Sequence, residues 1–365
     1  MIDVLVVGGG PAGLAAALAA RRRGLSVTVR EVRPGPVDKA CGEGIMPGGV
    51  AILRRWDVDP PGVQLRGIRY LTRSAAATAD FRSGPGRGVR RVGLHQALID
   101  AAQNAGVNID SGRVADLRQD ERGVSVGGVR ARYVVAADGL HSSIRTELGI
   151  PFTASGPRRW GIRQHFACDP WTDYVEVHWA PEAEAYVTPV GPSCVNVAIL
   201  TTVRGSFDEQ LMAFPELRNR LGATAVDRPR AAGPLLHRVS DQVAGRVLLV
   251  GDAAGYVDAL TGEGLSIAFA CAEAAALRIV EDRPELYRRD YLRISRRYRL
   301  ITTGLLLATR HARVRRRIVP AAQRLPGVFD FAVTQLAKEP AVQAVTRFSR
   351  ASASNGALPS ASLSK

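Results

Sequence analysis

Cysteine is scarce in this chain, and long apolar runs are absent. The four cysteines lie far apart among 365 residues, with no CxxC pair and no histidine at metal-ligand spacing. This spacing argues against a zinc site or a disulfide framework, so we expect no metal site and a reducing, cytoplasmic setting. No stretch approaches the roughly 18 consecutive apolar residues that a membrane-spanning helix needs.

Acidic residues are outnumbered by basic ones, 34 against 49, which gives a formal net charge of +15. Such a charge raises the question of a nucleic-acid partner or an anionic membrane. The arginines are scattered, however, and no nucleic-acid recognition motif accompanies them. We therefore expect no nucleic-acid partner, and we assign most of the charge to the solvated surface and to an anionic cofactor.

The N-terminus has the pattern of a nucleotide-binding β-α-β unit. An apolar run at residues 3–7 leads into a glycine-rich turn at residues 8–13, an alanine-rich helix pattern and a second apolar run at residues 26–31. In such a unit the glycines permit a tight turn, and a pyrophosphate binds at the N-terminus of the helix. The unit alone does not distinguish FAD from NAD(P).

Each glycine of the turn has a separate expected task. Gly8 allows the tight turn, Gly10 lets the backbone approach a pyrophosphate, and Gly13 lets the helix pack against the strand. Glu31 ends the second strand, where a carboxylate can accept a hydrogen bond from a ribose hydroxyl.

Farther along the chain, a loop rich in Gly and Pro carries Cys41-Gly42-Glu43-Gly44 just before a short helix pattern. Residues 89–92 are predicted as a strand and residues 94–105 as a helix. From residue 157 to 202 the pattern changes to alternating runs, which predict an antiparallel sheet. The sheet is followed by predicted helices at 207–221, 263–279, 287–311, 314–324 and 329–338.

Two further aspartates follow buried strands, in Ala137-Asp138-Gly139 and in Gly251-Asp252. The ends of parallel strands form the mouth of a sheet, where cofactors bind. A helix N-cap is the alternative role for Asp252, and a turn position is the alternative role for Asp138.

These pieces together resemble the FAD-dependent oxidoreductases of the aromatic hydroxylase (p-hydroxybenzoate hydroxylase-type) superfamily, including its geranylgeranyl-reductase-like branch. The resemblance covers roughly residues 1 to 280. It implies bound FAD, with NAD(P)H docking transiently as the reductant and without a Rossmann domain of its own.

The resemblance also implies site residues. Arg91 would neutralise part of the pyrophosphate environment, Asp138 would support the pyrophosphate side, and Asp252 would accept a hydrogen bond from a ribityl hydroxyl. The amides that open the helix after Gly262 would face the pyrimidine end of the flavin. The expected cofactor-binding residues are Gly8, Gly10, Pro11, Ala12, Gly13, Glu31, Val32, Arg33, Cys41, Gly42, Arg91, Asp138, Gly251, Asp252, Gly262, Glu263, Gly264 and Leu265.

The sequence departs from the ordinary aromatic hydroxylases in the Gly262-Glu263-Gly264 step, where they usually have Gln. This step and Cys41-Gly42-Glu43-Gly44 look more like the geranylgeranyl-reductase-like branch, which places a cysteine near the flavin ring. We therefore expect the catalytic residues to be Cys41, Glu43 and Tyr186. A small buried apolar role is the alternative for Cys41.

The polar side chains of the predicted sheet leave a question open. Alternation places Arg163 and His165 on one face of their strand, but the sequence does not indicate which face lines the pocket. For His165 and His178, the ordinary interpretation is a surface side chain or a side chain whose hydrogen bonds are satisfied within the protein. Tyr186 lies beside prolines but lacks the Trp that the reductase branch usually carries near its polyprenyl chain, which favours a compact substrate.

We therefore predict an α/β fold: a Rossmann-like FAD-binding domain, an inserted antiparallel-sheet substrate domain and a helical C-terminus. The expected segments are 1–72, 89–156 and 240–282 for FAD, 73–88 and 157–239 for the substrate sheet, 283–348 for C-terminal helices and 349–365 for a disordered tail.

Two activities fit this prediction. The first is an NAD(P)H-driven flavin monooxygenase that hydroxylates an aromatic or polyketide-like small molecule. The alternative is an ene reductase that saturates C=C bonds of an isoprenoid or other apolar substrate.

The basic C-terminal helices leave two interpretations open. They close the substrate lobe with an exposed basic face, or they contact the inner face of an anionic membrane peripherally. The oligomeric state is not indicated by the sequence.

Overall fold

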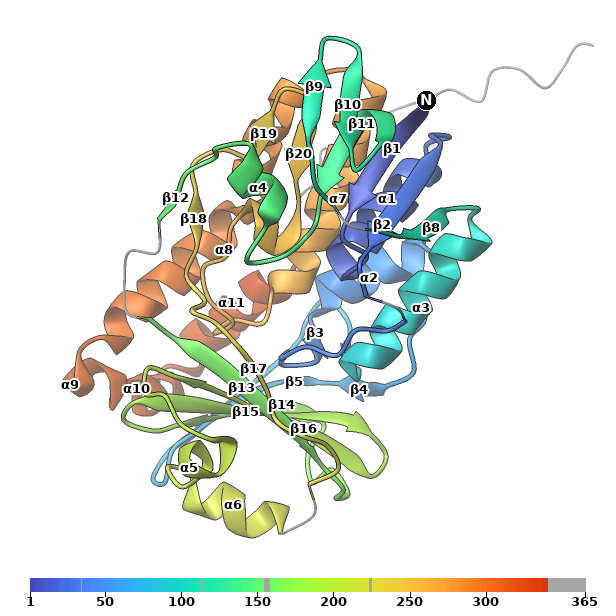
Figure 1. The fold of residues 1–365 in the computed structure, drawn as a ribbon. Helices are drawn as coiled ribbons and strands as arrows, with labels where there is room; N and C mark the ends of the chain where they lie inside the picture. The colour runs from blue at the N-terminus through green and yellow to red at the C-terminus, as the bar shows by residue number, and fades with distance from the viewer. Residues whose placement is uncertain (34, 113, 154–157, 223–224, 341–365) are drawn as a thin grey trace, which may run out of the picture.

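The structure is a computed structural model that describes residues 1–33, 35–112, 114–153, 158–222 and 225–340. It contains two large sheets with helices between and around them (Figure 1). The predicted disordered tail at 349–365 lies outside the described residues.

The first sheet is built on the predicted β-α-β unit. Strand β1 (Ile2–Val7) pairs in parallel with β2 (Val27–Glu31) and with β11 (Val129–Ala136), while α1 (Pro11–Arg21) connects β1 to β2. The eight-stranded sheet has the path β19-β20-β11-β1-β2-β8. Strand β10 also pairs with β11, and β9 pairs with β10. Its other strands are β8 (Asn108–Ser111), β9 (Arg118–Asp120), β10 (Gly123–Val126), β19 (Val243–Ala244) and β20 (Val247–Leu249).

The second sheet has seven strands in the order β17-β13-β16-β15-β14-β5-β6. Its bounds are β5 (Gly67–Leu71), β6 (Ala76–Asp80), β13 (Trp160–Phe166), β14 (Tyr174–Trp179), β15 (Ala183–Gly191), β16 (Cys194–Thr201) and β17 (Arg230–Ala232). Its central strands pair antiparallel as predicted, whereas β5 pairs with β14 in parallel. Because β5 belongs to this sheet, the sheet begins before residue 73, the first boundary predicted for it.

Two small sheets and the helices complete the fold. The small sheets are β3-β7-β4, with β3 (Gly44–Ile45), β4 (Val63–Leu65) and β7 (Gly86–Gly88), and β12-β18, with β12 (Phe152–Thr153) and β18 (Arg238–Val239). The helices are α2 (Pro47–Arg55), α3 (Arg91–Asn104), α4 (Ser143–Glu147), α5 (Phe207–Leu211), α6 (Pro215–Leu221), α7 (Gly264–Val280), α8 (Tyr287–Thr309), α9 (Ala312–Arg315), α10 (Ile318–Arg324) and α11 (Pro326–Ala337), with short 3-10 turns η1 (Gly251–Ala254) and η2 (Pro284–Leu286). The α/β fold with an inserted sheet and a helical C-terminus is therefore confirmed.

Two local predictions are corrected. The strand expected at 89–92 is absent from the described chain there, because β7 ends at Gly88 and α3 begins at Arg91. The single helix expected at 207–221 is two helices, since Pro215 occupies the first turn of α6 and cannot continue α5.

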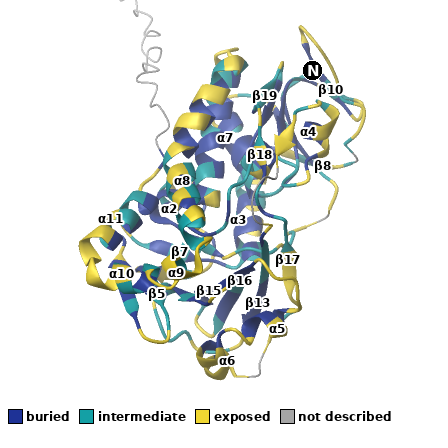
Figure 2. Cartoon of the chain, turned by 90° about the vertical axis from the view of Figure 1, so that its left-hand side faces the viewer, coloured by how far each residue is buried: buried dark blue, intermediate teal, exposed yellow. Residues whose placement is uncertain are grey.

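The two faces of the seven-stranded sheet have different neighbours. On β15, Ala185 and Val187 belong to the apolar cluster formed with α5 and α6. Tyr186, between them, belongs to a second cluster formed with α10 and α11. Because successive residues of a strand point to opposite faces, the face carrying Tyr186 is the one that looks toward the first sheet. Figure 2 shows that the strands of the seven-stranded sheet are largely buried between these two clusters.

A buried ion cluster joins this inner face to the C-terminal helices. The carboxylate of Glu184 on β15 pairs with Arg159, and it also lies 2.5 Å from the guanidinium of Arg315 in α9. The Glu184 side chain is fully buried, and both arginine side chains are at least nine-tenths buried. The carboxylate of Glu184 therefore pairs with two desolvated cations, and Asp258 lies 3.6 Å from Arg159 as a more distant second partner.

Replacing this carboxylate should destabilise the fold. Glu184→Ala leaves Arg159 and Arg315 buried without their shared anion, so we expect the free energy of unfolding to fall by about 3–5 kcal/mol in urea denaturation. Glu182→Ala is the matched control. Glu182 is exposed just before β15, so its replacement should change the free energy of unfolding little. Equal stability of the two variants would contradict the importance of the cluster.

Candidate functional site

A cleft lies between the two sheets. It is lined on one side by the N-terminus of α1, the loop at residues 39–44 and the N-terminus of α7, and on the other by β13–β16. The predicted residues that line it are Gly10, Pro11, Ala12, Cys41, Gly42, Glu43, Arg91, Tyr186, Gly251, Asp252, Gly262, Gly264 and Leu265. Segments far apart in the sequence thus meet at one place.

The N-terminus of α1 is arranged to receive an anion. A Cβ added at Gly13 would lie 1.8 Å from the carbonyl oxygen of Gly8, so only glycine lets the helix sit this close to the first strand. In contrast, a Cβ at Gly10 would meet nothing within 4 Å. The cleft is therefore open at the point where the uncapped amides of the helix begin, which is the arrangement that binds phosphate groups.

Glu31 is held beside this turn. Its carboxylate accepts hydrogen bonds from the amides of Gly9 at 2.8 Å and Arg33 at 3.1 Å. Burial raises the pKa of Glu31, but these two hydrogen bonds outweigh it and lower the pKa below its usual value. The carboxylate therefore stays ionised, with lone pairs left to accept a hydrogen bond from a hydroxyl. Val32, the next residue in the chain, is exposed to solvent.

His95 on α3 fixes the same turn and was not indicated by the sequence. The amide of Val37 donates to its Nδ1 at 2.8 Å, so Nε2 carries the proton and donates to the carbonyl of Gly9 at 2.6 Å. Burial lowers the pKa of His95, which agrees with a neutral ring. Nothing in the sequence pattern marks this one histidine of a helix as the partner of a distant turn.

Opposite charges meet in the middle of the cleft. Arg91 is 7% exposed, and its Nη1 has no hydrogen-bond partner among the described residues. Burial lowers the pKa of Lys39, which also faces the cleft. Burial raises the pKa of Asp252, although Lys39 and Arg91 act against that shift. These side chains can pair with a molecule that presents both negative groups and hydroxyls.

Three predicted cofactor-binding carboxylates do not line the cleft: Glu31, which lies beside the turn before α1, and Asp138 and Glu263. Asp138 accepts hydrogen bonds from the hydroxyl of Ser143 at 3.2 Å and the amide of Ile144 at 3.1 Å, and so stabilises the start of α4. Glu263 precedes α7 and is 2% exposed, and burial raises its pKa to about 8 while Arg297 acts in the opposite direction. The Glu263 side chain is therefore buried and that of Asp138 is half-buried against α4, which a strand-end motif does not reveal.

The Cys41 loop is held by the seven-stranded sheet. Asn196 donates to the carbonyl of Cys41 at 3.0 Å, and Thr188 donates to that of Gly42 at 2.8 Å. Burial raises the pKa of the Cys41 thiol, and the carboxylate of Glu43 raises it further. Cys41 is therefore a thiol and not a thiolate at neutral pH.

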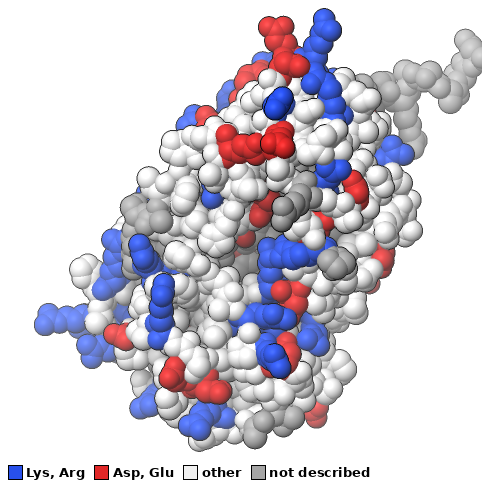
Figure 3. Space-filling view, viewed as in Figure 1, with Lys and Arg blue, Asp and Glu red and all other residues white. Residues whose placement is uncertain are grey.

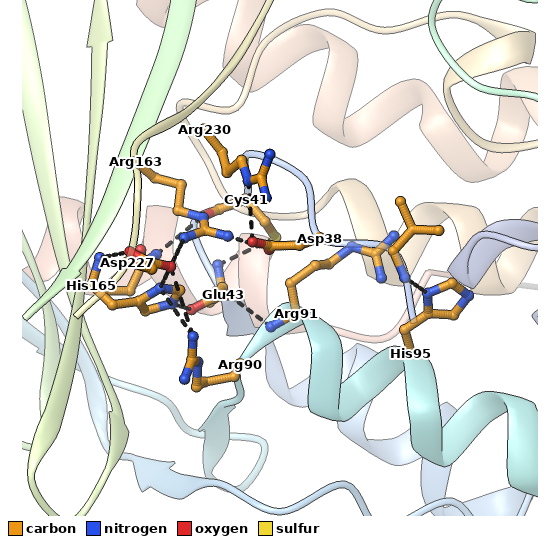
Figure 4. A network of polar contacts seen from close by, with 12 residues as sticks. Asp38, Cys41, Glu43, Arg90, Arg91, His95, Arg163, His165, Asp227 and Arg230 are labelled. Atoms are coloured by element: carbon orange, nitrogen blue, oxygen red, sulfur yellow. Dashed lines mark hydrogen bonds and ion pairs between the residues drawn. The ribbon is translucent and has the colours of Figure 1, made fainter. Parts of the chain in front are cut away.

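Glu43 contacts both sides of the cleft (Figure 4). Its carboxylate accepts a hydrogen bond from the amide of Arg91 at 2.7 Å, and its other oxygen lies 2.6 Å from Nε2 of His165. The opposite ring nitrogen of His165 lies 2.7 Å from Asp227. Arg163 and His165 therefore face the cleft loop, which answers the question that alternation left open. Asp227 was not indicated by the sequence, because it precedes a strand of three residues.

Tyr186 has a structural contact. Its hydroxyl donates to the carbonyl of Leu260 at 2.9 Å, and burial raises its pKa well above the usual value. It orders the loop before α7 and contributes its ring to the cleft wall. Most of the rest of this wall is apolar, and its larger side chains are those of Leu65, Ile68, Tyr70, Phe81, Val177 and Leu200.

A β-α-β unit with an open glycine turn, opposite a largely apolar wall and with a thiol and a carboxylate between them, is an arrangement that fits an FAD-dependent oxidoreductase. The chain belongs to the FAD binding domain family, whose model matches residues 1–279. The predicted aromatic-hydroxylase-type family, with relatives among the geranylgeranyl reductases, is therefore confirmed.

Sequence relatives with known activities include reductases and a monooxygenase. Menaquinone reductase of Mycobacterium tuberculosis is 30% identical over 325 residues, 75% of each chain. Digeranylgeranylglycerophospholipid reductase 2 of Methanopyrus kandleri is 30% identical over 322 residues, 77% of this chain and 78% of that one. Rifampicin monooxygenase of Streptomyces venezuelae is 33% identical over 181 residues, 43% of this chain and 36% of that one.

Solved structures share the fold. A triple mutant of the flavin-dependent brominase Bmp2 matches with a TM-score of 0.80 at 17% identity, covering 92% of this chain and 94% of that chain. The anhydrotetracycline hydroxylase OxyS of Streptomyces rimosus matches with a TM-score of 0.71 at 21% identity, covering 92% and 76%.

The residues present fit FAD. The open turn at Gly10 and the unpartnered Nη1 of Arg91 suit the pyrophosphate, Glu31 suits the adenosine ribose, and Asp252 suits the ribityl chain. The N-terminus of α7, at Gly264, adds a partial positive charge to the same cleft.

Removing the buried cation should weaken FAD binding. For Arg91→Gln we expect FAD affinity to fall about ten- to a hundred-fold, as measured by flavin fluorescence, because a hydrogen bond between charged groups contributes about 1.5–3 kcal/mol. Arg87→Gln is the control, since Arg87 pairs with Asp59 outside the cleft. Unchanged affinity in Arg91→Gln would refute this role.

Proposed function

We propose that the protein is an FAD-dependent reductase that saturates a C=C bond of a lipophilic substrate. The observation that carries this proposal is a protonated thiol, Cys41, placed with Glu43 in a cleft whose far wall is apolar. Saturating such a bond requires a hydride on one carbon and a proton on the other. Bound FAD, reduced by NAD(P)H, supplies the hydride.

The chain's own residues divide the remaining work. The apolar wall binds the substrate and excludes water, as a pocket for a lipophilic molecule does. Cys41, whose raised pKa keeps its proton at neutral pH, donates that proton to the second carbon. Thr188 and Asn196 hold the loop that carries the thiol, so the donor keeps its position relative to the wall.

The sequence relatives also favour a reductase over a monooxygenase. Relatives that align over three-quarters of this chain are named menaquinone reductase and digeranylgeranylglycerophospholipid reductase, and both names denote reduction of a molecule with apolar character. The Trp expected beside a polyprenyl chain is absent from residues 186–192. We therefore propose a compact apolar substrate or a short isoprenoid.

An NAD(P)H-driven monooxygenase acting on an aromatic or polyketide-like molecule is the second candidate. It is favoured by the relationship to rifampicin monooxygenase, which covers a smaller part of the chain, and by the fold shared with a tetracycline-type hydroxylase. The tyrosine-lined wall at Tyr70 and Tyr186 would accept an aromatic ring.

Oxygen dependence separates the two candidates. We expect the dithionite-reduced holoenzyme, mixed anaerobically with geranylgeranyl diphosphate or with a menaquinone carrying a short isoprenoid chain, to reoxidise and yield a product whose isoprenoid chain is heavier by two hydrogens after any quinol has been reoxidised in air. Mass spectrometry and flavin absorbance measure this result. Products that appear only with O2 and contain an added oxygen would replace the reductase by the monooxygenase.

The proton donor is tested separately. For Cys41→Ala we expect the rate of substrate reduction to fall about a hundred-fold, as loss of a general acid does, while flavin reduction by NAD(P)H stays unchanged. Stopped-flow absorbance measures both steps. Cys271→Ala, which removes a buried cysteine of α7 outside the cleft wall, is the control. A Cys41→Ala enzyme that reduces its substrate at the normal rate would end this role.

We also propose that the C-terminal helices contact an anionic membrane from which the lipophilic substrate enters. Large apolar side chains are exposed on them: Leu300 at 66%, Val328 at 64% and Phe331 at 65%. Arginine side chains project from the same end of the molecule, over α9 (Figure 3). Exposed apolar groups beside basic ones are the pattern of an interfacial contact. In the part of the chain that the structure describes, every helix is too short or too polar to cross a membrane.

Vesicles test this contact. We expect the holoenzyme to co-sediment with phosphatidylglycerol vesicles, less at high salt and less for Phe331→Ser. Met212→Ser is the matched control. Met212 is also exposed, at 60%, but it follows α5, which packs on the outer face of the seven-stranded sheet, away from the C-terminal helices. No sedimentation of the wild-type protein would exclude the membrane.

A further inference from the structure

A chain of polar contacts leads from the cleft to the molecular surface (Figure 4). It begins at Glu43, which is 2% exposed, continues through the ring of His165, which is 1% exposed, and reaches Asp227, whose side chain is 20% exposed. The three side chains come from the cleft loop, from β13 and from the segment before β17. The fold thus connects a fully buried acid to solvent through a single imidazole.

Both nitrogens of this ring can give or accept a proton. Nε2 lies 2.6 Å from Glu43, and Nδ1 lies 2.7 Å from Asp227. Nδ1 also lies 2.8 Å from Nη1 of Arg163, which can donate to it. The ring is therefore hydrogen-bonded in either neutral tautomer and in the doubly protonated form, and this is the requirement for passing a proton.

The charges that face the ring come from every element packed around it. Arg163 lies on the same strand, pairs with Asp227 at 2.6 Å and also contacts Asp38 of the cleft loop. Arg90, just before α3, lies 3.5 Å from Nδ1 and 3.7 Å from Asp227. Burial raises the pKa of Asp227, but the hydrogen bonds from His165 and Arg163 lower it to about 2. Asp227 is consequently a fixed anion that orients the ring.

Glu43 itself has an unusual backbone. It has a φ of 60°, in the left-handed region that side chains other than Gly, Asn and Asp rarely adopt. This conformation places one carboxylate oxygen against His165 while the other accepts the Arg91 amide. Strain of this kind persists where the surrounding structure requires the side chain at that place.

We propose that His165, oriented by Asp227, restores the proton that Glu43 delivers to the cleft. His165 is a positioning residue that acts through Glu43, and nothing in its strand pattern marked it. This inference rests on the proposed reductase function.

The protons balance over one turnover. Reduced FAD gives a hydride to one carbon of the C=C bond, and the Cys41 S–H bond breaks as its proton moves to the other carbon. A proton then passes from Nε2 of His165 through the Glu43 carboxylate to the thiolate, while Nδ1 takes up a proton from solvent at the part-exposed edge of Asp227. The ring then exchanges back to its Nε2-protonated tautomer, so each turnover consumes one hydride and one solvent proton, and NAD(P)H would supply the next hydride through the flavin.

The test compares two histidines. His165→Gln removes the relay, and His178→Gln is the matched control, because His178 also pairs with a carboxylate, Glu176 at 3.3 Å, on β14 of the same sheet. In anaerobic stopped-flow with the short-chain menaquinone, we expect His165→Gln to slow substrate reduction at least tenfold, with its pH dependence lost. Flavin reduction by NADPH or NADH and the KM should be unchanged, and His178→Gln should behave as wild type.

Two further measurements do not depend on a folded Gln variant, and the second of them does not depend on turnover. Added imidazole should restore part of the rate of His165→Ala, which a merely structural role would not allow. In the ¹⁵N NMR titration of the holoenzyme, Asp227→Asn should move the His165 midpoint to lower pH, because the ring loses its neighbouring anion.

The outcomes are distinguishable. A wild-type enzyme that reduces neither probe substrate overturns the proposed function, and the NMR titration then decides alone whether His165 and Asp227 are coupled. An unmoved midpoint in Asp227→Asn overturns the inference. Equal slowing of both half-reactions by His165→Gln also overturns it, because it would reveal a general loss of structure.

Discussion

The hydrogen bonds from Thr188 and Asn196 to the carbonyls of Gly42 and Cys41 are the contacts on which the site depends. They attach a loop of the nucleotide-binding half to the sheet that forms the opposite wall. Because the loop carries both the thiol and the acid, its position determines the distance between the proton source and anything bound against the apolar strands. The buried pairing of Arg163 with Asp38 anchors the same loop a few residues earlier. The two sheets therefore act as one unit at this point, even though their strands do not pair.

Much of the fold could be predicted because local patterns determine it. The apolar run, glycine turn and helix before Glu31 identify the β-α-β unit, and the alternating runs after residue 157 identify four strands of the second sheet. The position of β5 could not be predicted in this way. Its parallel pairing with β14 joins residues about a hundred positions apart, and an alternating pattern does not specify a partner strand.

The site was predictable where backbone geometry demands a residue type and unpredictable where a side chain only needs a partner. Gly13 is required by a close approach to Gly8, and such a requirement is visible in the sequence. His95, His165 and Asp227 meet their partners only through tertiary contacts. The carboxylates of Asp138 and Glu263 illustrate the reverse case, since each stands in a suggestive motif, but Asp138 bonds to the start of α4 and Glu263 is buried outside the cleft lining. A motif fixes the position of the chain, and packing decides the direction of the side chain.

Lys39 has a consequence of a different kind. In the printed sequence lysine occurs only at positions 39, 338 and 365, so the chain has few primary amines despite its strong positive charge. Burial lowers the pKa of Lys39, and a larger share of its amine is therefore unprotonated and nucleophilic at mildly alkaline pH. Because this amine faces the cleft, its acylation by a small ester reagent depends on whether a ligand covers it. Because the chain uses arginine in place of most lysines, the amine of Lys39 is one of very few acylation sites, and its reactivity would report whether a cofactor occupies the cleft.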